Sequence, residues 1–283
     1  MHIPPYDNSN RPIVGSGDPD VPLAYLNVVH LKKGERFSSG VPGYETCLVP
    51  VHGTIDVQVE TGKGPFSFDA VGERKTLWEG EPSGVYVPLG ATANFVCVSD
   101  NTEVFVAGAR CDEAYQPFVV RPAHIDFVQY GSDETKTHRK IKHILGRNPP
   151  GQVGRLLVSE LFTVGAGGWS GFPPHKHDTD RLPDETRHDE VYNFRFRPNH
   201  GFGLQLLQEP DARVGRAFHV VEGSTFKIRS GYHPCVAAPG YEMYYFTVLA
   251  GATQRPLVQY FQPEHAYQVE TIPGIKDMIA KFR

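Results

Sequence analysis

The sequence predicts an all-β protein, and two observations support this: the composition and the spacing of the apolar runs. The chain has 283 residues, including 29 glycines, 24 prolines, 13 tyrosines and 17 phenylalanines. Aromatic and β-branched residues favour strands, whereas glycine and proline favour tight turns. At this length the chain can bury a substantial core, either in one large domain or in two of ordinary size.

Strand-like runs fill residues 21–120. Each run is rich in β-branched or aromatic residues and is bounded by Gly, Pro, Asn or Asp, which is the pattern of short strands between turns. The runs are AYLNVVHL, TCLVPVHGTIDVQVE, SGVYVPLGATANFVCV and TEVFVAGA.

Residues 153–262 repeat this plan. The runs there are VGRLLVSELFTV, EVYNFRFRP, GFGLQLLQE, STFKIRSGYHPCVAA and EMYYFTVLAG. VYVPLGATANFVCV of the first half aligns with FKIRSGYHPCVAA of the second, and EVFVAGA aligns with YYFTVLAG, which is a weak but consistent internal repeat. Two antiparallel barrels of the cupin or jelly-roll type accommodate these strands and leave few exposed edges. The predicted architecture is therefore a bicupin, with two such barrels in one chain.

A charged segment separates the two halves. GSDETKTHRKIKHILGRNPPG ends in an Asn-Pro-Pro-Gly breaker, so we predict a connector there. The predicted domains are an N-terminal barrel over residues 1–130, a connector over 131–152 and a C-terminal barrel over 153–283. The last residues, IPGIKDMIAKFR, are predicted to form one short helix.

Charge and composition exclude several classes of partner. A formal net charge of −4 provides no basic field for nucleic acid or anionic lipid. The first residues lack an apolar signal core, and no run approaches the length of a membrane span. The widely spaced cysteines predict buried thiols rather than a zinc knuckle or a disulfide framework. We expect a cytoplasmic protein with no nucleic-acid partner and no membrane association.

The stretch WSGFPPHKHDTD, residues 169–180, contains the leading candidate for a functional site. Its two prolines remove backbone donors, so they fit the approach to an edge strand better than a helix. His175 and His177, two positions apart, then point to the same face of a strand. Two imidazoles so placed converge on one point, as metal ligands do, and a surface or core pair is the alternative.

Two further residues complete a candidate ligand set. After a polar loop, Glu190 opens the run EVYNFRF, and GYHP supplies His233. Asp189 is an alternative to Glu190, but Glu190 is favoured because it shares one face with the apolar side chains of Tyr192 and Phe194. Three imidazoles and one carboxylate suit Zn²⁺, Mn²⁺, Fe²⁺ or Ni²⁺ and leave coordination positions open. We predict one divalent metal ion per chain, held by His175, His177, Glu190 and His233.

The first half offers no such set. Glu45 stands where the second half has Glu190, and Thr92 stands where it has His233, but no HxH precedes Glu45. The remaining histidines of this half, such as His52, lack partners at ligand spacing. The N-terminal barrel is therefore predicted to be metal-free and structural. The sequence does not decide whether the protein forms a homo-oligomer. If it does, the N-terminal barrel would supply the interface between subunits.

Two long stretches carry a family resemblance, RLLVSELFTVGAGGWSGFPPHKHDTDRLPDETRHDEVYNFRF and GYHPCVAAPGYEMYYFTVLAG. They resemble the core of the 5-deoxy-glucuronate isomerase family of bacterial myo-inositol catabolism. The resemblance extends upstream to ETCLVPVHGTIDV, LWEGEPSGVYVPLGA and RKIKHILG, so it covers residues 20–262. PPHKHDTD and GYHPCVAAPGY are specific to this family, whereas HxH with a later Glu and His indicates only a metal-binding cupin.

This resemblance implies a bicupin that carries its metal in the C-terminal barrel, with the four predicted ligands on the family's ligand positions. It implies a metal-dependent aldose–ketose isomerase that converts 5-deoxy-D-glucuronate to 5-dehydro-2-deoxy-D-gluconate, so a uronate would be its small-molecule partner. The related 4-deoxy-threo-hexosulose-uronate isomerases share the arrangement with a shorter loop. The chain departs from the family pattern at VYNF and at WSGFPPH. Both departures lie beside the predicted site and concern the binding of the substrate, not the ligation of the metal.

Isomerisation of an aldehyde beside a hydroxyl into a ketone moves a proton between adjacent carbons, which a Lewis-acidic metal and one general base would support. Candidates for the base lie on the inward face and in the loop over the barrel mouth. The predicted catalytic residues are Tyr192, Asp178 and Gln205, with Asp180, Glu185 and Asp189 as further acid/base candidates. Lys176 and Arg187 are predicted to bind the substrate carboxylate, and an ordinary surface charge is the alternative for each.

Two other functions would use the same features. A cupin dioxygenase would place Fe²⁺ or Ni²⁺ in the same ligand set, but the polar loop over residues 178–189 disfavours it. A non-catalytic sugar-binding bicupin would keep the fold without needing an open metal position. Oxygen uptake would identify the first alternative, and turnover of a uronate would exclude the second.

Overall fold

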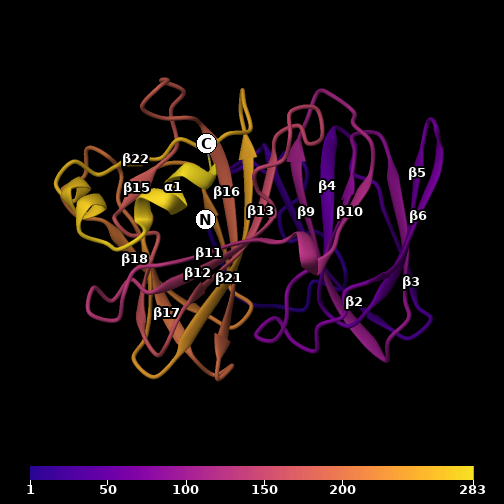
Figure 1. Ribbon diagram of the computed structural model, residues 1–283, viewed down its shortest axis with the longest axis horizontal. Coiled ribbons are helices and arrows are strands. Elements are labelled where there is room, and N and C mark those ends of the chain that lie inside the picture. Colours follow the sequence, from indigo (N-terminus) through magenta and orange to yellow (C-terminus); the bar gives the residue numbers. More distant parts are fainter. Residues whose placement is uncertain (283) are drawn as a thin grey trace.

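The computed structural model describes residues 1–282 and confirms the all-β prediction. Figure 1 shows two halves side by side, each built from sheets whose strands pair in antiparallel fashion. The helices of the described residues are short: η1 (Pro122–His124), η2 (Ala266–Glu270) and α1 (Ile275–Phe282). The last of these is the helix predicted at the C-terminus.

Two sheets form the first half. The larger sheet has the order β10-β7-β4-β9-β2 and the smaller has the order β3-β8-β5-β6. The strands of the larger sheet are β2 (Ala24–Lys32), β4 (Tyr44–His52), β7 (Gly84–Val87), β9 (Asn101–Arg110) and β10 (Phe118–Val120). Those of the smaller sheet are β3 (Arg36–Ser39), β5 (Ile55–Thr61), β6 (Gly64–Val71) and β8 (Thr92–Cys97).

The second half repeats this arrangement with additions. Its larger sheet has the order β1-β19-β16-β21-β13-β12-β11, its smaller sheet has the order β14-β20-β17-β18, and β15 pairs with β22. The strands of the larger sheet are β1 (His2–Ile3), β11 (Asp126–Tyr130), β12 (Arg139–Leu145), β13 (Leu156–Thr163), β16 (His188–Arg197), β19 (Thr225–Ile228) and β21 (Glu242–Gly251). The others are β14 (Gly168–Ser170), β15 (His175–Lys176), β17 (Phe202–Leu207), β18 (Arg216–Val221), β20 (Cys235–Ala237) and β22 (Tyr260–Phe261).

Each half encloses its own core, and a third core lies between the halves. Phe105 of β9 packs against Phe246 of β21 in that third core, with ring centroids 4.6 Å apart. The neighbouring residues Val106 and Tyr245 face the interior of their own half. Because both faces of β9 and β21 are buried, their sequences are nearly continuous apolar runs instead of alternating ones.

The segment predicted as a connector contributes a strand to the second half. β12 pairs with β11 on one side and with β13 on the other. Its charges obscured this strand in the sequence, yet Arg139 and Lys142 are both buried. The division of the chain into domains at residues 130 and 152 stays a prediction, while strand pairing places β11 and β12 in the C-terminal sheet.

The cysteines agree with the sequence, because Cys47, Cys97, Cys111 and Cys235 are all buried and unpaired by disulfides. Within residues 1–282, no helix combines the length and the hydropathy that a membrane span requires.

Candidate metal centre

Two of the predicted ligands lie at β15, the short edge strand that follows Pro173 and Pro174. β15 pairs with β22, from the C-terminal end of the chain. Alternation along this extended segment directs His175 and His177 into a cavity and Lys176 to the opposite side. The two imidazoles therefore share one face, as the HxH spacing predicts.

Glu190 and His233 reach the same point from two other elements. Glu190 lies near the start of β16, and His233 lies just before β20. Oε2 of Glu190 is 3.0 Å from Nε2 of His177 and 3.2 Å from Nε2 of His233. The ligand atoms of His175, His177 and His233 all lie within 4.8 Å of one another. The structure thus brings the four predicted ligands together, and all four are buried.

Backbone carbonyls fix the orientation of the three imidazoles. Each Nδ1 faces a carbonyl oxygen, and the pairs are His175 with Pro173 (3.3 Å), His177 with His188 (3.2 Å) and His233 with Gly231 (2.8 Å). Since a carbonyl can only accept, each Nδ1 carries the proton and each Nε2 presents a lone pair. Lone pairs that face one another and a carboxylate repel unless a cation lies among them. The donor set therefore fits a divalent metal, with carbonyls supporting the ligands from behind.

The electrostatics of His175 and Glu190 agree with this, whereas the lowering effect of burial on the pKa of His177 is outweighed by its contact with Glu190, so that pKa is raised. Burial lowers the pKa of His175 well below its ordinary value, and the neighbouring imidazoles lower it further. Burial would raise the pKa of Glu190, but its contacts with His177 and His233 outweigh that effect and hold the pKa far below the ordinary range. A neutral imidazole and an ionised carboxylate are the protonation states that metal binding requires.

Asp189, the alternative to Glu190, points away from the histidines. Its Oδ2 accepts a hydrogen bond from the backbone N–H of Leu23 in the first half, at 2.9 Å. Neighbouring residues of a strand face opposite sides of the sheet, so only one of the two carboxylates can reach the cluster. That residue is Glu190.

Three members of the cluster, His175, His177 and Glu190, line a cavity inside the second half. Tyr192 also lines this cavity, and its ring centroid is 4.4 Å from that of Tyr245. The segment after the last long strand supplies Gln259, whose Nε2 is 2.9 Å from Nε2 of His175, and α1 supplies Met278. No motif in the sequence pointed to Gln259, which is a single polar residue between Val258 and Tyr260.

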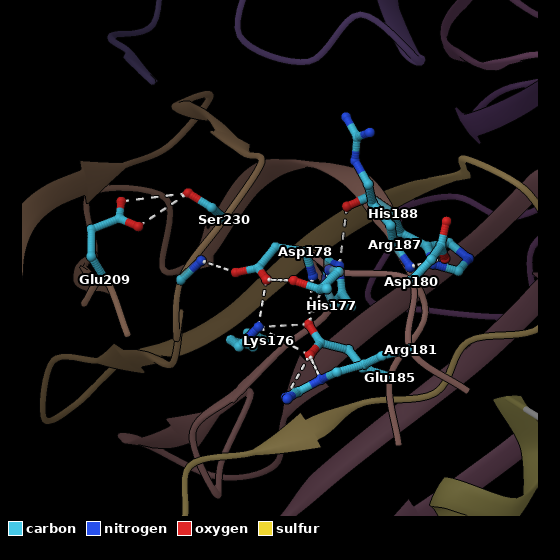
Figure 2. Close-up of polar contacts among 12 residues, drawn as sticks. Lys176, His177, Asp178, Asp180, Arg181, Glu185, Arg187, His188, Glu209 and Ser230 are labelled. Carbon is cyan, nitrogen blue, oxygen red and sulfur yellow. Dashed lines mark hydrogen bonds and ion pairs between the residues drawn. The ribbon is translucent and has the colours of Figure 1, made fainter. Parts of the chain in front are cut away.

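Lys176 lies in a buried polar network outside the cavity. Its Nζ donates to Asp178 at 2.5 Å and to Glu185 at 2.8 Å, and Figure 2 shows these residues joined with Arg181. Glu185 is fully buried and also accepts from the backbone N–H groups of Asp178 and Thr179. The network holds the loop that follows the HxH strand. Because two carboxylates already pair with Lys176, its position does not support the predicted contact with substrate.

Two predicted catalytic residues support the loop that carries His233. Oδ2 of Asp178 accepts from the backbone N–H of Gly231 at 2.9 Å. Gln205, which is fully buried, donates from Nε2 to the carbonyl of His233 at 2.8 Å. Neither side chain lines the cavity. Both side chains contact the segment that carries His233, and their catalytic roles stay predictions.

The remaining predicted residues divide between the surface and the cavity. Arg187 donates its backbone N–H to Asp180 at 2.7 Å, and Figure 2 shows its side chain directed away from the Lys176 network. Its guanidinium does not line the cavity. Of the predicted catalytic and substrate-binding residues, Tyr192 is the one that does. The cavity wall also contains Arg139 of β12, for which the sequence predicts no role.

The fold and the ligand cluster define a class of protein, a bicupin with a candidate metal centre in its second half. Oxalate decarboxylase from Bacillus subtilis shares the fold, with a TM-score of 0.59 over 95% of this chain and 82% of that one at 12% identity. A crystal structure of an IolB-like protein from Salmonella typhimurium LT2 is more similar, with a TM-score of 0.78 at 29% identity over 87% of this chain and 89% of that one.

The chain belongs to the KduI/IolB family, whose match covers residues 4–268. A relative from Geobacillus kaustophilus (strain HTA426) named 5-deoxy-glucuronate isomerase is 31% identical over 87% of this chain and 86% of its own length. A relative of the same name from Bacillus subtilis (strain 168) is 28% identical over 91% of this chain and 92% of its own length. The resemblance found in the sequence is thereby confirmed, and the enzyme class is that of an isomerase.

Proposed function

We propose that this chain is a cytoplasmic, metal-dependent aldose–ketose isomerase that converts 5-deoxy-D-glucuronate to 5-dehydro-2-deoxy-D-gluconate in myo-inositol degradation. The observation that carries the proposal is the buried cluster of three imidazoles and Glu190, of which His175, His177 and Glu190 line a cavity. The names of the relatives supply the substrate. Zn²⁺, Mn²⁺ and Fe²⁺ are the proposed metals, because imidazole and carboxylate ligands suit each of them.

The residues proposed to hold the metal are His175, His177, Glu190 and His233. A divalent metal bound there would supply Lewis acidity beside the substrate carbonyl. The chain itself holds the sugar and excludes water, and one of its groups moves a proton between two adjacent carbons. Tyr192 is the cavity residue proposed to orient the substrate, since a phenol can donate a hydrogen bond to a sugar oxygen.

Metal analysis of the purified protein, followed by NMR of 5-deoxy-glucuronate incubated with it, tests this function. We expect one divalent metal ion per chain and the replacement of the aldehyde by a ketone, without consumption of oxygen. A metal-loaded protein that leaves the uronate unchanged would contradict the isomerase. Oxygen uptake would support a dioxygenase instead.

Turnover in D₂O then tests the proton route. A base that exchanges its proton with solvent would place deuterium at the former aldehyde carbon, whereas a hydride shift would keep the hydrogen of the substrate. The variant Tyr192→Phe is run beside the wild type. If Tyr192 only orients the substrate, this variant loses rate moderately and keeps the labelling pattern. A loss of about four orders of magnitude would instead assign it the acid/base role.

A further inference from the structure

Arg139 places a positive charge on the wall of the cavity that contains the histidine cluster. The residue lies at the start of β12 and is 3% exposed. Taking a guanidinium out of water is unfavourable, so buried arginines are normally paired with a carboxylate. The buried charge of Arg139 therefore needs an anionic partner, either from the protein or from a molecule bound in the cavity.

The hydrogen-bond partners of Arg139 are all neutral. One terminal nitrogen donates to the hydroxyl of Tyr130 at 2.6 Å, and the other donates to the hydroxyl of Tyr245 at 3.0 Å. The hydroxyl of Tyr245 is in turn 2.6 Å from Oγ of Ser170. The Nε–H of Arg139 is buried and has no partner among the described residues. The tyrosines therefore fix the direction of the guanidinium without neutralising it.

The other buried cations of the chain differ in this respect. Arg74 pairs with Glu160 at 2.5 Å, Lys142 pairs with Glu81 at 3.2 Å, and Lys176 pairs with two carboxylates. Within residues 1–282, no carboxylate lies within 4.0 Å of the Arg139 guanidinium. Arg139 is thus the buried cation that faces the cavity and lacks an anion from the protein.

We propose that Arg139 binds the carboxylate of the substrate and selects acidic sugars over neutral ones. This rests on the proposed function, because it assigns the uronate carboxylate to Arg139 while the carbonyl end of the sugar lies at the histidines. A guanidinium has five N–H donors, and the tyrosines occupy two of them. The Nε–H has no acceptor among the described residues, and a guanidinium with donors left over can form the forked pair that carboxylates make with arginine.

Two variants of β12 test this proposal: Arg139→Gln, and the control Lys140→Gln. Lys140 is the next residue along the strand, is half-buried and does not line the cavity. The measurement is kcat/KM for 5-deoxy-glucuronate and for its neutral primary amide, with metal content determined on each preparation. We expect Arg139→Gln to lower kcat/KM for the acid by about 10²- to 10³-fold, the range for removing one partner of a buried charge pair. The amide should be nearly unaffected, and the metal content and the control should match wild type.

The acid-to-amide ratio separates a binding role from a structural one. If Arg139→Gln lowers kcat/KM equally for both compounds, Arg139 only holds the cavity together and the proposal is overturned. Should this variant fail to fold, Arg139→Lys replaces it. That variant keeps the charge but loses the fork, so the proposal requires a smaller decrease of the same ratio, and an unchanged ratio overturns it.

A wild-type protein that converts neither compound would overturn the proposed isomerase function but not the assignment of Arg139. Calorimetric titration with D-glucuronate and D-glucuronamide then decides the assignment. Tighter binding of the acid by wild type, lost in the variant, supports it. Equal binding of the two probes by wild type overturns it.

Discussion

The two halves of the molecule use the same sheet but carry different side chains at matching positions. In the first half, Ala109 of β9 pairs with Glu45 of β4 and with the first residue of β2. In the second half, Ala250 of β21 pairs with Asp189 of β16 and with the first residue of β13. Strand pairing therefore makes Asp189, and not Glu190, the counterpart of Glu45.

These two counterparts act in the same way across the boundary between the halves. Glu45 accepts hydrogen bonds from the backbone N–H groups of residues 154–156, which lead into β13, at 2.5 to 2.9 Å. Asp189 accepts a hydrogen bond from the backbone N–H of Leu23, which leads into β2. Each half thus uses a buried carboxylate to hold the start of a strand in the other half.

The halves diverge one position further along the strand. Glu190 pairs with Leu249, and its counterpart Thr46 pairs with Gly108. This corrects the sequence alignment of Glu45 with Glu190, because a slip of one residue moves a side chain to the opposite face of a sheet. A carboxylate on the inward face can join the histidine cluster, whereas one on the outward face joins the two halves.

The largest effect is expected from removing a ligand in the second half. His175→Ala or His233→Ala should abolish both bound metal and isomerase activity, because each removes one of the few donors of the site. The fold should persist, since the apolar cores within and between the halves stay intact. Metal analysis and circular dichroism check this, with His52→Ala in the first half as the matched control. Full metal occupancy in either ligand variant would refute the ligand assignment.

Removing the carboxylate of Glu45 in the first half should lower stability but leave metal binding unchanged. Glu45→Ala leaves three backbone N–H groups and the hydroxyl of Tyr86 without their acceptor. Each orphaned donor costs about 1 to 3 kcal/mol, and such losses do not add fully, so we expect the free energy of unfolding to fall by about 3 to 5 kcal/mol. Metal content should stay at one ion per chain. Chemical denaturation gives the first quantity, and two ions per wild-type chain would show that the first half also binds metal.

The sequence predicts those structural features that are determined by residues close together along the chain. The run EMYYFTVLAG coincides with β21, because both faces of that strand are buried and its apolar signal is strong. His175 and His177 follow from alternation alone, and the shared face of Glu190 and Tyr192 selects Glu190. These are local inferences, and the structure agrees with each of them.

Partners that are distant along the chain could not be inferred in this way. Lys176 pairs with Glu185 across a loop whose path no local pattern specifies. The strand that carries Arg139 was hidden because Arg and Lys alternate with its apolar residues, so the segment reads as a charged connector. The sequence alignment of Glu45 with Glu190 is wrong because the true match depends on the register of β4 against β9 and of β16 against β21. The partners of charged residues and the register of paired strands depend on tertiary contacts, whereas the alternation of side chains along a strand is visible in the sequence itself.

Asp189, the counterpart of Glu45, should contribute less to the free energy of unfolding than Glu45 does. Asp189 accepts one backbone hydrogen bond, and its Oδ1 is buried without a partner among the described residues. Asp189→Ala should therefore lower the free energy of unfolding by about 1 to 2 kcal/mol, near the value of one unsatisfied donor. Denaturation of this variant beside Glu45→Ala measures the difference. A loss of metal in Asp189→Ala would instead place Asp189 in the ligand sphere.

The smallest effect concerns one histidine in each half, the buried His143 and the half-buried His52. Burial lowers the pKa of His143, on β12, to about 4, with Asp126 opposing and Lys281 adding to that shift. In the unfolded chain its pKa is near 6.5, so the unfolded state takes up a proton first as the pH falls, and stability decreases from pH 6.5 towards pH 4. Between pH 7.5 and 5.5 this amounts to about 1 kcal/mol. His52 in the first half is also shifted downward by burial, but Glu103 opposes that shift. His143→Asn should therefore flatten the pH dependence of the unfolding free energy more than His52→Asn does, and equal slopes in the two variants would show that His143 does not stay neutral in the fold.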